Sequence, residues 1–242
     1  KTAYEIRPRD WSSDVCSSDL DVRDEQAVHA AIEQAAAAFG GIDIVVNNAS
    51  AVSRTPVVET DMKRYDLMQA INTRGTFMVS KYAIPHLAKA QNPHILMNSP
   101  PLAMQEESFA GSTGYSIAKF GMSLVALGLA GELRGKGIAV NALWPRFTIA
   151  TAAIKNLLGG ERVMRMSRTP EIMADAAYAI FLKPAKSFTG HFLIDDTFLA
   201  GEGVTDFEKY RAAPGEPLAG TFFVPSDPPP PKGVSIGGNR WE

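Results

Sequence analysis

Hydrophobic residues along this chain follow two spacings, one typical of helices and one typical of buried strands. Residues 24–40 repeat apolar positions every three or four residues, begin with an aspartate that can cap a helix, and end at Gly40 and Gly41. Residues 42–46 form a short β-branched run that stops at Asn47. Such a run predicts a strand that is buried on both faces, as in a parallel sheet.

The same two patterns alternate through the rest of the chain. We expect further helices at 61–87, 115–133 and 171–181, helical structure up to 158 after a loop at 144–151, and strands at 94–98, 138–143 and 191–194. Strands that alternate with helices of this length predict an α/β fold with a Rossmann-like, doubly wound parallel sheet.

The two ends of the chain depart from this pattern. Residues 1–20 show neither spacing and resemble a translated sequencing adapter, so we interpret them as an artefactual segment; a disordered natural terminus is the alternative. Residues 214–242 contain seven of the sixteen prolines and five glycines, which predicts a surface-draped or disordered tail. The folded domain is therefore expected at 21–213.

Charge and composition exclude several classes of function. The chain has 24 basic and 26 acidic residues, so it lacks the positive surface that nucleic-acid binding needs. No apolar run approaches the roughly 20 residues of a membrane span and the start is unlike a signal peptide, so we expect no membrane span and a cytoplasmic location. One cysteine and four scattered histidines predict neither a disulfide nor a metal site.

The strongest candidate for chemistry is the pair Tyr115 and Lys119. Residues four apart lie one turn above the other on a helix, so their side chains can share one site. A phenol has a pKa near 10, and a nearby ammonium favours its ionised form. The pair can thus act as a general acid or base, although the same spacing is frequent on solvated helix faces.

Four segments, in this order, resemble the motifs of the short-chain dehydrogenase/reductase family. They are GGIDIVVNNAS at 40–50, INTRG at 71–75, YSIAK at 115–119 and IAVNALWP at 138–145. Ser50 and Arg146 stand where the family usually has glycine. The resemblance implies an oxidoreductase that moves hydride between NAD or NADP and a small-molecule alcohol or carbonyl, with a lipid-like substrate left open.

The resemblance also implies roles for individual residues. Tyr115 would exchange the substrate proton, while Lys119 would bond the nicotinamide ribose and lower the pKa of Tyr115. Asn72 would anchor a water that links Lys119 to solvent; a helix asparagine bonded to nearby backbone is the alternative. The positions expected along the cofactor, besides Tyr115 and Lys119, are Asp21, Val22, Asn47, Ala49, Pro145, Ile149 and Thr151. Asp21 would bond the adenine amine, or else simply precede the first helix.

The family's serine has two candidates. Ser99 ends the segment HILMNS and is the natural choice to polarise the substrate oxygen, but it lies sixteen positions before Tyr115, further than is usual in the family. Either the intervening loop carries an insertion and Ser99 still reaches the site, or Pro100 occupies the serine's place. We favour Ser99.

A Gly-rich phosphate loop of the family's T-G-x-x-x-G-x-G kind is missing from the sequence. We interpret residues 21–213 as a domain of this family that is N-terminally truncated, with the first two βα units and the loop absent. The truncation predicts an unpaired edge and an exposed apolar face at strand 42–46, and it leaves the choice between NAD and NADP open. A noncatalytic Rossmann-like interaction protein or an inactive fragment is the rival; the parent enzyme could form a homo-oligomer.

Overall fold

The computed structural model describes residues 19–235 and 237, which form two compact units. Of these residues, 19–144 and 180–193 belong to what we call the sheet unit, and 145–179, 194–235 and 237 to the second unit. Each unit is described by itself. The predicted artefactual segment lies almost entirely outside the described residues and stays a prediction.

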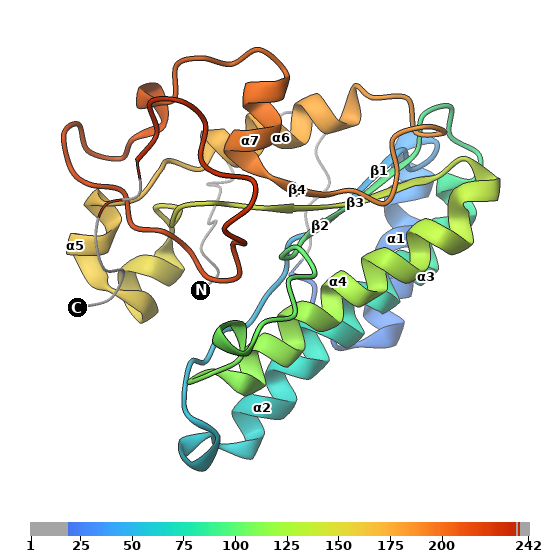
Figure 1. Cartoon of the computed structure of the whole chain (residues 1–242). Coiled ribbons are helices and arrows are strands. Elements are labelled where there is room, and N and C mark those ends of the chain that lie inside the picture. Colours follow the sequence, from blue (N-terminus) through green and yellow to red (C-terminus); the bar gives the residue numbers. More distant parts are fainter. Residues whose placement is uncertain (1–18, 236, 238–242) are drawn as a thin grey trace. The chain divides into compact units, whose positions relative to one another are not determined.

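The sheet unit is built on a parallel sheet with strand order β1-β2-β3-β4. The strands are β1 (Ile44–Asn47), β2 (His94–Asn98), β3 (Ala139–Trp144) and β4 (Phe192–Ile194). β1 pairs in parallel with β2, and β2 with β3. Three helices, α1, α3 and α4, lie on one side of these strands in Figure 1, where α3 and α4 contact them. The prediction of a parallel α/β sheet is confirmed.

Helix α1 (Glu25–Phe39) begins and ends where its sequence predicts. The Asp24 carboxylate accepts hydrogen bonds from the backbone N–H groups of Gln26 and Ala27, which satisfies two donors that the first helical turn leaves unpaired. Gly40 then ends the helix at φ 77°, a left-handed conformation that glycine adopts without steric cost.

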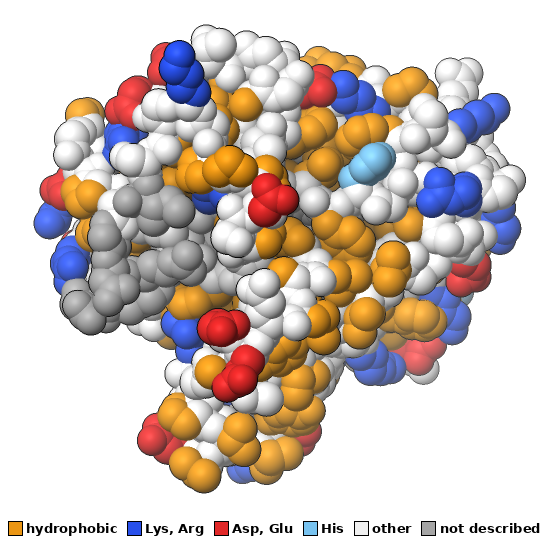
Figure 2. All heavy atoms as spheres, in the orientation of Figure 1, with side chains coloured by type: hydrophobic (Ala, Val, Ile, Leu, Met, Phe, Trp, Pro, Cys, Tyr) orange, Lys and Arg blue, Asp and Glu red, His pale blue; other side chains and the backbone are white. Residues whose placement is uncertain are grey.

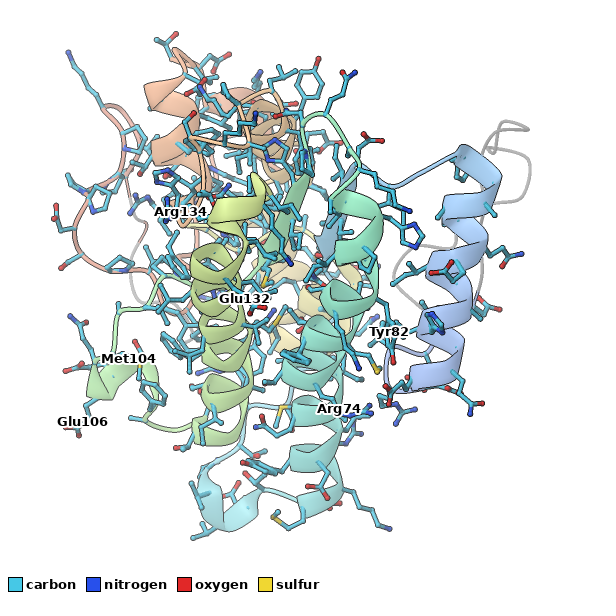
Figure 3. The ribbon with its side chains drawn as sticks, turned by 90° about the vertical axis from the view of Figure 1, so that its right-hand side faces the viewer. Arg74, Tyr82, Met104, Glu106, Glu132 and Arg134 are labelled. Atoms are coloured by element: carbon cyan, nitrogen blue, oxygen red, sulfur yellow. The ribbon has the colours of Figure 1, made fainter. Side chains whose placement is uncertain are left out.

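Polar side chains hold α1 against α3 (Thr76–Leu87). Tyr82 donates to the Glu25 carboxylate, and the ring of His86 lies 2.8 Å from Glu33. Figure 3 shows Tyr82 of α3, and Arg74 two residues before α3, on the side that faces α1. The Arg74 guanidinium donates to the backbone oxygen of Arg23 at 2.8 Å. The start of the described chain is thereby fixed to the sheet unit.

The helix predicted at 61–87 is present but contains a segment of a different kind. It consists of α2 (Met62–Met68), a π-helix at Gln69–Gly75 and α3. A π-helix is rare and accommodates an extra residue in its wide turn, often at functional sites. The hydrophobic pattern did not predict it, because the apolar spacing on both sides is that of an ordinary helix.

Helix α4 (Thr113–Leu133) is the central helix of the sheet unit and begins two residues before its predicted start. Its residues Ala126, Leu129, Ala130 and Leu133 join Ile95, Met97, Ile138 and Val140 of the strand region in the main core. Contrary to the expectation that no apolar run approaches the length of a membrane span, the stretch Thr113–Lys136 is long and apolar enough to cross a membrane by length and composition. Because 56% of its most apolar window is buried inside the structure, it has the pattern of a core helix.

Strand β1 is buried on one face only, so the prediction of burial on both faces was wrong. Val45 and Asn47 are buried, whereas Ile44 and Val46 are 44% and 51% exposed. Among the described residues, β1 lies at the edge of the sheet, and α3 packs against it. Within the described part of the chain, β1 thus has an unpaired edge, and Ile44 and Val46 expose apolar side chains, as expected.

A second group of exposed hydrophobic residues lies in the 3-10 turn before α2 and at the first residue of α2. Val57, Val58 and Met62 are 67%, 93% and 62% exposed. Figure 2 shows hydrophobic atoms at the lower tip of the molecule, where α2 lies in Figure 1.

The second unit contains a π-helix at Ile154–Leu158, α5 (Gly160–Arg165), most of α6 (Glu171–Phe181) and α7 (Asp195–Gly201). Helix α6 occupies its predicted range, while α5 and α7 were not predicted. Short 3-10 turns elsewhere in the described chain lie at Val57–Glu59, Glu106–Ser108, Arg134–Lys136 and Glu208–Tyr210.

Part of the Pro-rich tail packs into the second unit, which corrects the prediction of a surface-draped or disordered segment. Leu218, Ala219 and Phe223 are 3%, 0% and 6% exposed. The backbone of Ala219 accepts from Thr148 N–H at 2.9 Å and donates to Met166 at 2.8 Å. Proline removes backbone donors, but the residues between the prolines still bond and bury their side chains.

Candidate active site

Tyr115 and Lys119 lie one turn apart in the first half of α4, as predicted, and both are buried, at 7% and 3% exposure. Two features set α4 close to the π-helix. Thr73 donates its hydroxyl hydrogen to the backbone oxygen of Ala118 at 3.1 Å, and a Cβ atom on Gly121 would overlap Thr73 Oγ1. Gly121 therefore lets α4 pack closely against the π-helix that contains Asn72, which fixes the positions of Tyr115 and Lys119.

The ammonium of Lys119 lies in neutral surroundings. Its Nζ donates to the backbone oxygen of Asn98 at 2.9 Å, lies 3.6 Å from Met122 Sδ, and is 5.2 Å from the ring centre of Trp144. None of these groups carries a negative charge. Burial therefore lowers the pKa of Lys119 from 10.5 to about 7.

The phenol of Tyr115 is shifted in the opposite direction. Burial raises its pKa above the ordinary value of 10.0, and the positive charge of Arg54 partly offsets this. Sequence reasoning did not select Arg54, which follows the Asn-Asn-Ala-Ser segment on a loop. Its only signal was a basic residue shortly after a strand end, which is too common to single out.

Asn72 is fully buried in the middle of the π-helix. Its side chain accepts from Ala51 N–H at 2.7 Å and donates to the backbone oxygen of Ala51 at 3.0 Å. Asn72 thus binds backbone, as in the simpler of the two interpretations, but that backbone belongs to the loop after β1 and not to its own helix. It ties this loop to the helix that packs against α4.

Asparagines gather at the carboxyl ends of β1 and β2. Asn47 is buried and donates to Ser80 Oγ at 3.0 Å, and the Asn98 side chain donates to Asn48 Oδ1 at 2.8 Å. Ala49 follows and is exposed. Sequence reasoning selected Asn47 and Ala49 but missed Asn98, because a partner fifty residues away leaves no trace in local spacing.

Similarity to known proteins identifies the family of this chain. A family model described as enoyl-(acyl carrier protein) reductase matches residues 5–196. Hydroxysteroid dehydrogenase-like protein 2 of Danio rerio is 54% identical over 209 residues, covering 86% of this chain and 50% of the relative; the Homo sapiens protein of that name is 51% identical, covering 86% and 49%. The chain belongs to the short-chain dehydrogenase/reductase family. It spans about half the length of these curated relatives.

A solved structure supports the same assignment. The crystal structure of a short chain dehydrogenase from Mycobacterium thermoresistibile has a TM-score of 0.81 and 47% sequence identity, and the match covers 90% of this chain and 76% of that one. The α/β Rossmann-like fold is therefore that of the short-chain dehydrogenase/reductase family, as the four motifs implied.

The two candidate positions for the family's serine, Ser99 and Pro100, have different surroundings. Ser99 is fully buried directly after β2, and its hydroxyl has no hydrogen-bond partner among the described residues. Pro100 instead contacts α4, because its backbone oxygen accepts from Ser123 Oγ at 2.6 Å. The part of Ser99 in catalysis stays a prediction.

Asp21 and Val22 lie at the start of the described chain. The Asp21 carboxylate binds the side chain and backbone N–H of Arg23, which lowers its pKa from 3.8 to about 2. Val22 packs where a Cβ atom on Gly75 would lie 3.0 Å from its Cγ2 atom. Asp24, not Asp21, caps α1. A role for Asp21 toward adenine stays a prediction.

Pro145, Ile149 and Thr151 belong to the second unit, on a loop that is fixed by its backbone. Ala150 N–H donates to Arg168 at 2.8 Å, and Arg146 N–H donates to the Asp195 carboxylate at 2.9 Å. The three residues are partly buried, and their contact with a cofactor stays a prediction.

Arg146, which replaces the family's usual glycine, belongs to a buried network of charges. Its Nε atom lies 2.8 Å from Asp196, and Arg168 Nη1 lies 3.1 Å from the same carboxylate. Arg168 also lies 4.6 Å from the ring centre of Phe147. Burial and the neighbouring Asp196 raise the pKa of Asp195. The network explains how an arginine is accommodated at this position.

The family uses NAD or NADP, and the residues of the sheet unit fit the hydroxyl-bearing part of such a molecule. Asn98 Oδ1 and Ser99 Oγ are buried without a hydrogen-bond partner among the described residues, next to the neutral surroundings of Lys119. Unpaired buried polar atoms are costly unless a ligand or water bonds them. The sequence offers no Gly-rich loop for the phosphates.

Proposed function

We propose that the protein containing this chain is an NAD(P)-dependent oxidoreductase that interconverts an alcohol and a carbonyl. Tyr115 would exchange the proton of the substrate oxygen, and Lys119 would bind the nicotinamide ribose. The name of the relatives makes hydroxysteroids and ketosteroids the first substrates to test. The observation that carries the proposal is the burial of Tyr115 and Lys119 one helical turn apart beside the carboxyl end of β2.

The arrangement supports proton transfer in the direction of carbonyl reduction. Because burial raises the pKa of Tyr115, the phenol keeps its proton at neutral pH and can donate it to the substrate oxygen. A bound nicotinamide would supply the hydride. Lys119, whose pKa is lowered to about 7, can return a proton toward Tyr115, since both of its protonation states are accessible near neutral pH.

For alcohol oxidation the phenol must lose its proton first. The positive charge of Arg54 favours the phenolate and partly offsets the effect of burial on the pKa of Tyr115. Asn72 would hold the loop after β1 in place through its two bonds to Ala51.

The test is Tyr115→Phe, which removes only the hydroxyl group. We expect kcat/KM for ketosteroid reduction to fall by about 10²–10⁴-fold, the usual contribution of a general acid, while cofactor binding is retained. The measurement is NADH or NADPH consumption followed by absorbance. Tyr178→Phe, at a tyrosine that is 66% exposed, serves as the matched control and should leave the rate unchanged.

The noncatalytic alternative gives a different result. If the parent protein shows no turnover with any alcohol or carbonyl, or if Tyr115→Phe keeps more than half of the rate, the proposal is wrong.

A further inference from the structure

Asn98 is the last residue of β2 and contacts two parts of the sheet unit at once. Its backbone oxygen accepts from Lys119 Nζ at 2.9 Å. Its side-chain Nδ2 donates to Asn48 Oδ1 at 2.8 Å, and Asn48 directly follows β1. The two strand ends are thus joined by a side-chain bond, which we call the amide bridge, at the point where the ammonium binds.

The Asn98 carbonyl is the only strong hydrogen-bond acceptor of Lys119 among the described residues. Met122 Sδ at 3.6 Å is a weak acceptor, and the Trp144 ring at 5.2 Å offers only a cation–π contact. A charge-assisted hydrogen bond is stronger and more directional than either. The place of the ammonium therefore depends on the place of one backbone oxygen.

The backbone of Asn98 is paired on one side of β2 only. Asn98 pairs with Leu143 of β3, whereas the pairing with β1 stops at Met97. On the side of β1, the amide bridge takes over beyond that point. It joins Asn98 to Asn48 one residue past the paired Asn47 and Met97.

We propose that Asn98 is a positioning residue: the Asn48–Asn98 amide bridge fixes the carbonyl to which Lys119 Nζ donates, and so holds the ammonium one helical turn from Tyr115. The inference rests on the proposed function for its catalytic consequence only, because the position of Lys119 can be measured without substrate.

Three described groups contact the Lys119 ammonium, and none of them titrates: Met122 from α4, Asn98 from β2 and Trp144 from β3. Tyr115 lies one turn away on the same helix. The pKa of Tyr115 is raised, so its phenol is neutral across the range in which Lys119 titrates. A change in the titration of Lys119 therefore reports on its hydrogen bond to Asn98.

The experiment uses Asn98→Ala, Asn48→Ala and the double variant, with lysine labelled by ¹³C at Cε. The titration midpoint of Lys119 is read by NMR in the absence of cofactor, and its signal is assigned from Lys119→Met. We expect the midpoint to fall by about half a pKa unit in both single variants. The hydrogen bond to the Asn98 oxygen stabilises the ammonium against the effect of burial, so weakening this bond lets burial lower the pKa of Lys119 further. The double variant should equal the single ones, since both substitutions break the same bond.

Turnover provides the second readout. We expect kcat to fall roughly tenfold in both single variants, with KM for the cofactor within about threefold, because the bridge is expected to act on the proton-transfer pair more than on binding. Asn48→Asp keeps an acceptor for Asn98 Nδ2 and should restore most of kcat. Asn48 is exposed, so its variants keep the fold even if Asn98→Ala does not.

Asn92→Ala is the matched control, two residues before the start of β2. The Asn92 side chain bonds Phe181, Lys183 and Ala185, far along the strand from Lys119, so its loss should lower stability without moving the Lys119 midpoint. An unchanged or higher midpoint in Asn48→Ala and Asn98→Ala overturns the inference. A lower midpoint in a protein without any turnover supports the positioning role and rejects the proposed function instead.

Discussion

The two units hold buried positive charge in different ways. In the second unit, Arg146 and Arg168 are 2% and 0% exposed, and both contact the Asp196 carboxylate. In the sheet unit, Lys119 is 3% exposed and contacts a backbone oxygen, a thioether and an aromatic ring. The two arginines are thus paired with a carboxylate, whereas Lys119 has no carboxylate partner among the described residues.

This difference distinguishes buried charges that stabilise the fold from buried charges that can exchange a proton. A buried ion pair keeps its groups ionised, and its main effect is that neither partner can be removed without cost. A buried cation without a carboxylate has a shifted pKa and can exchange a proton near neutral pH, which is the property that catalysis uses. We therefore expect the Arg146 network to stabilise its loop, and the shifted pKa of Lys119 supports the role that we propose for it.

The largest expected effect tests the paired region. Asp196→Asn removes the carboxylate that Arg146 and Arg168 share, and we expect the free energy of unfolding to fall by about 3–5 kcal/mol because two guanidinium groups stay buried. Urea denaturation measures it. Glu216→Gln, at an exposed carboxylate 3.4 Å from Arg165, should change stability by less than about 1 kcal/mol. A similar loss of unfolding free energy in both variants would show that Asp196 does not stabilise the two buried guanidinium groups more than an exposed ion pair does.

The next effect tests the unpaired region and depends on pH. The pKa of Lys119 is lowered to about 7, whereas the unfolded chain keeps this proton up to about pH 10.5. Between these values the folded protein binds fewer protons than the unfolded one, so its stability rises with pH. Lys119→Met should therefore be more stable than the parent by roughly 2–4 kcal/mol below pH 7, and this advantage should disappear toward pH 10.

Denaturation of both proteins at about pH 6, 8 and 9.5 measures that difference. Arg146→Met is the contrasting variant, because it breaks a paired charge and should destabilise the protein at every pH in this range. A gain from Lys119→Met that is constant with pH would mean that Lys119 keeps its ordinary pKa.

The smallest effect concerns the frame around Lys119. A Cβ atom on Gly121 would overlap Thr73 Oγ1, so Gly121→Ala should lower the free energy of unfolding by about 1–3 kcal/mol. Gly128 lies on the same helix with no side-chain or other atom within 4 Å of such a Cβ atom. Gly128→Ala should instead stabilise the protein by about 0.5–1 kcal/mol through helix propensity. Equal effects at the two glycines would argue against close packing of α4 on the π-helix.

Much of the fold could be predicted because its information is local. Asp24 and Gly40 mark both ends of α1, and the largely apolar run HILMN at His94–Asn98 gives β2 to the residue. The structure of the second half of the chain was harder to predict. Helix α7 begins with Asp195 and Asp196, whose carboxylates serve a network from elsewhere in the unit, and Phe223 is buried despite its proline-rich surroundings. These features depend on tertiary contacts that no local spacing records.

The candidate site divides in the same way. The spacing of Tyr115 and Lys119 follows from the helix, so the sequence predicted their common face. It could not predict that Lys119 would bind Asn98, that Asn72 would bind Ala51 or that the charge of Arg54 would act on Tyr115. Each of these contacts joins segments that lie more than twenty residues apart in sequence.

The π-helix at Gln69–Gly75 makes chain length itself a constraint. Helix α2 runs into it and α3 continues from it without a break. Because the wide turn holds one residue more than an α-turn, deleting one residue here would leave an ordinary α-helix and remove the turn that holds Asn72. The two bonds from Asn72 to Ala51 therefore depend on the number of residues in this stretch as well as on their identity.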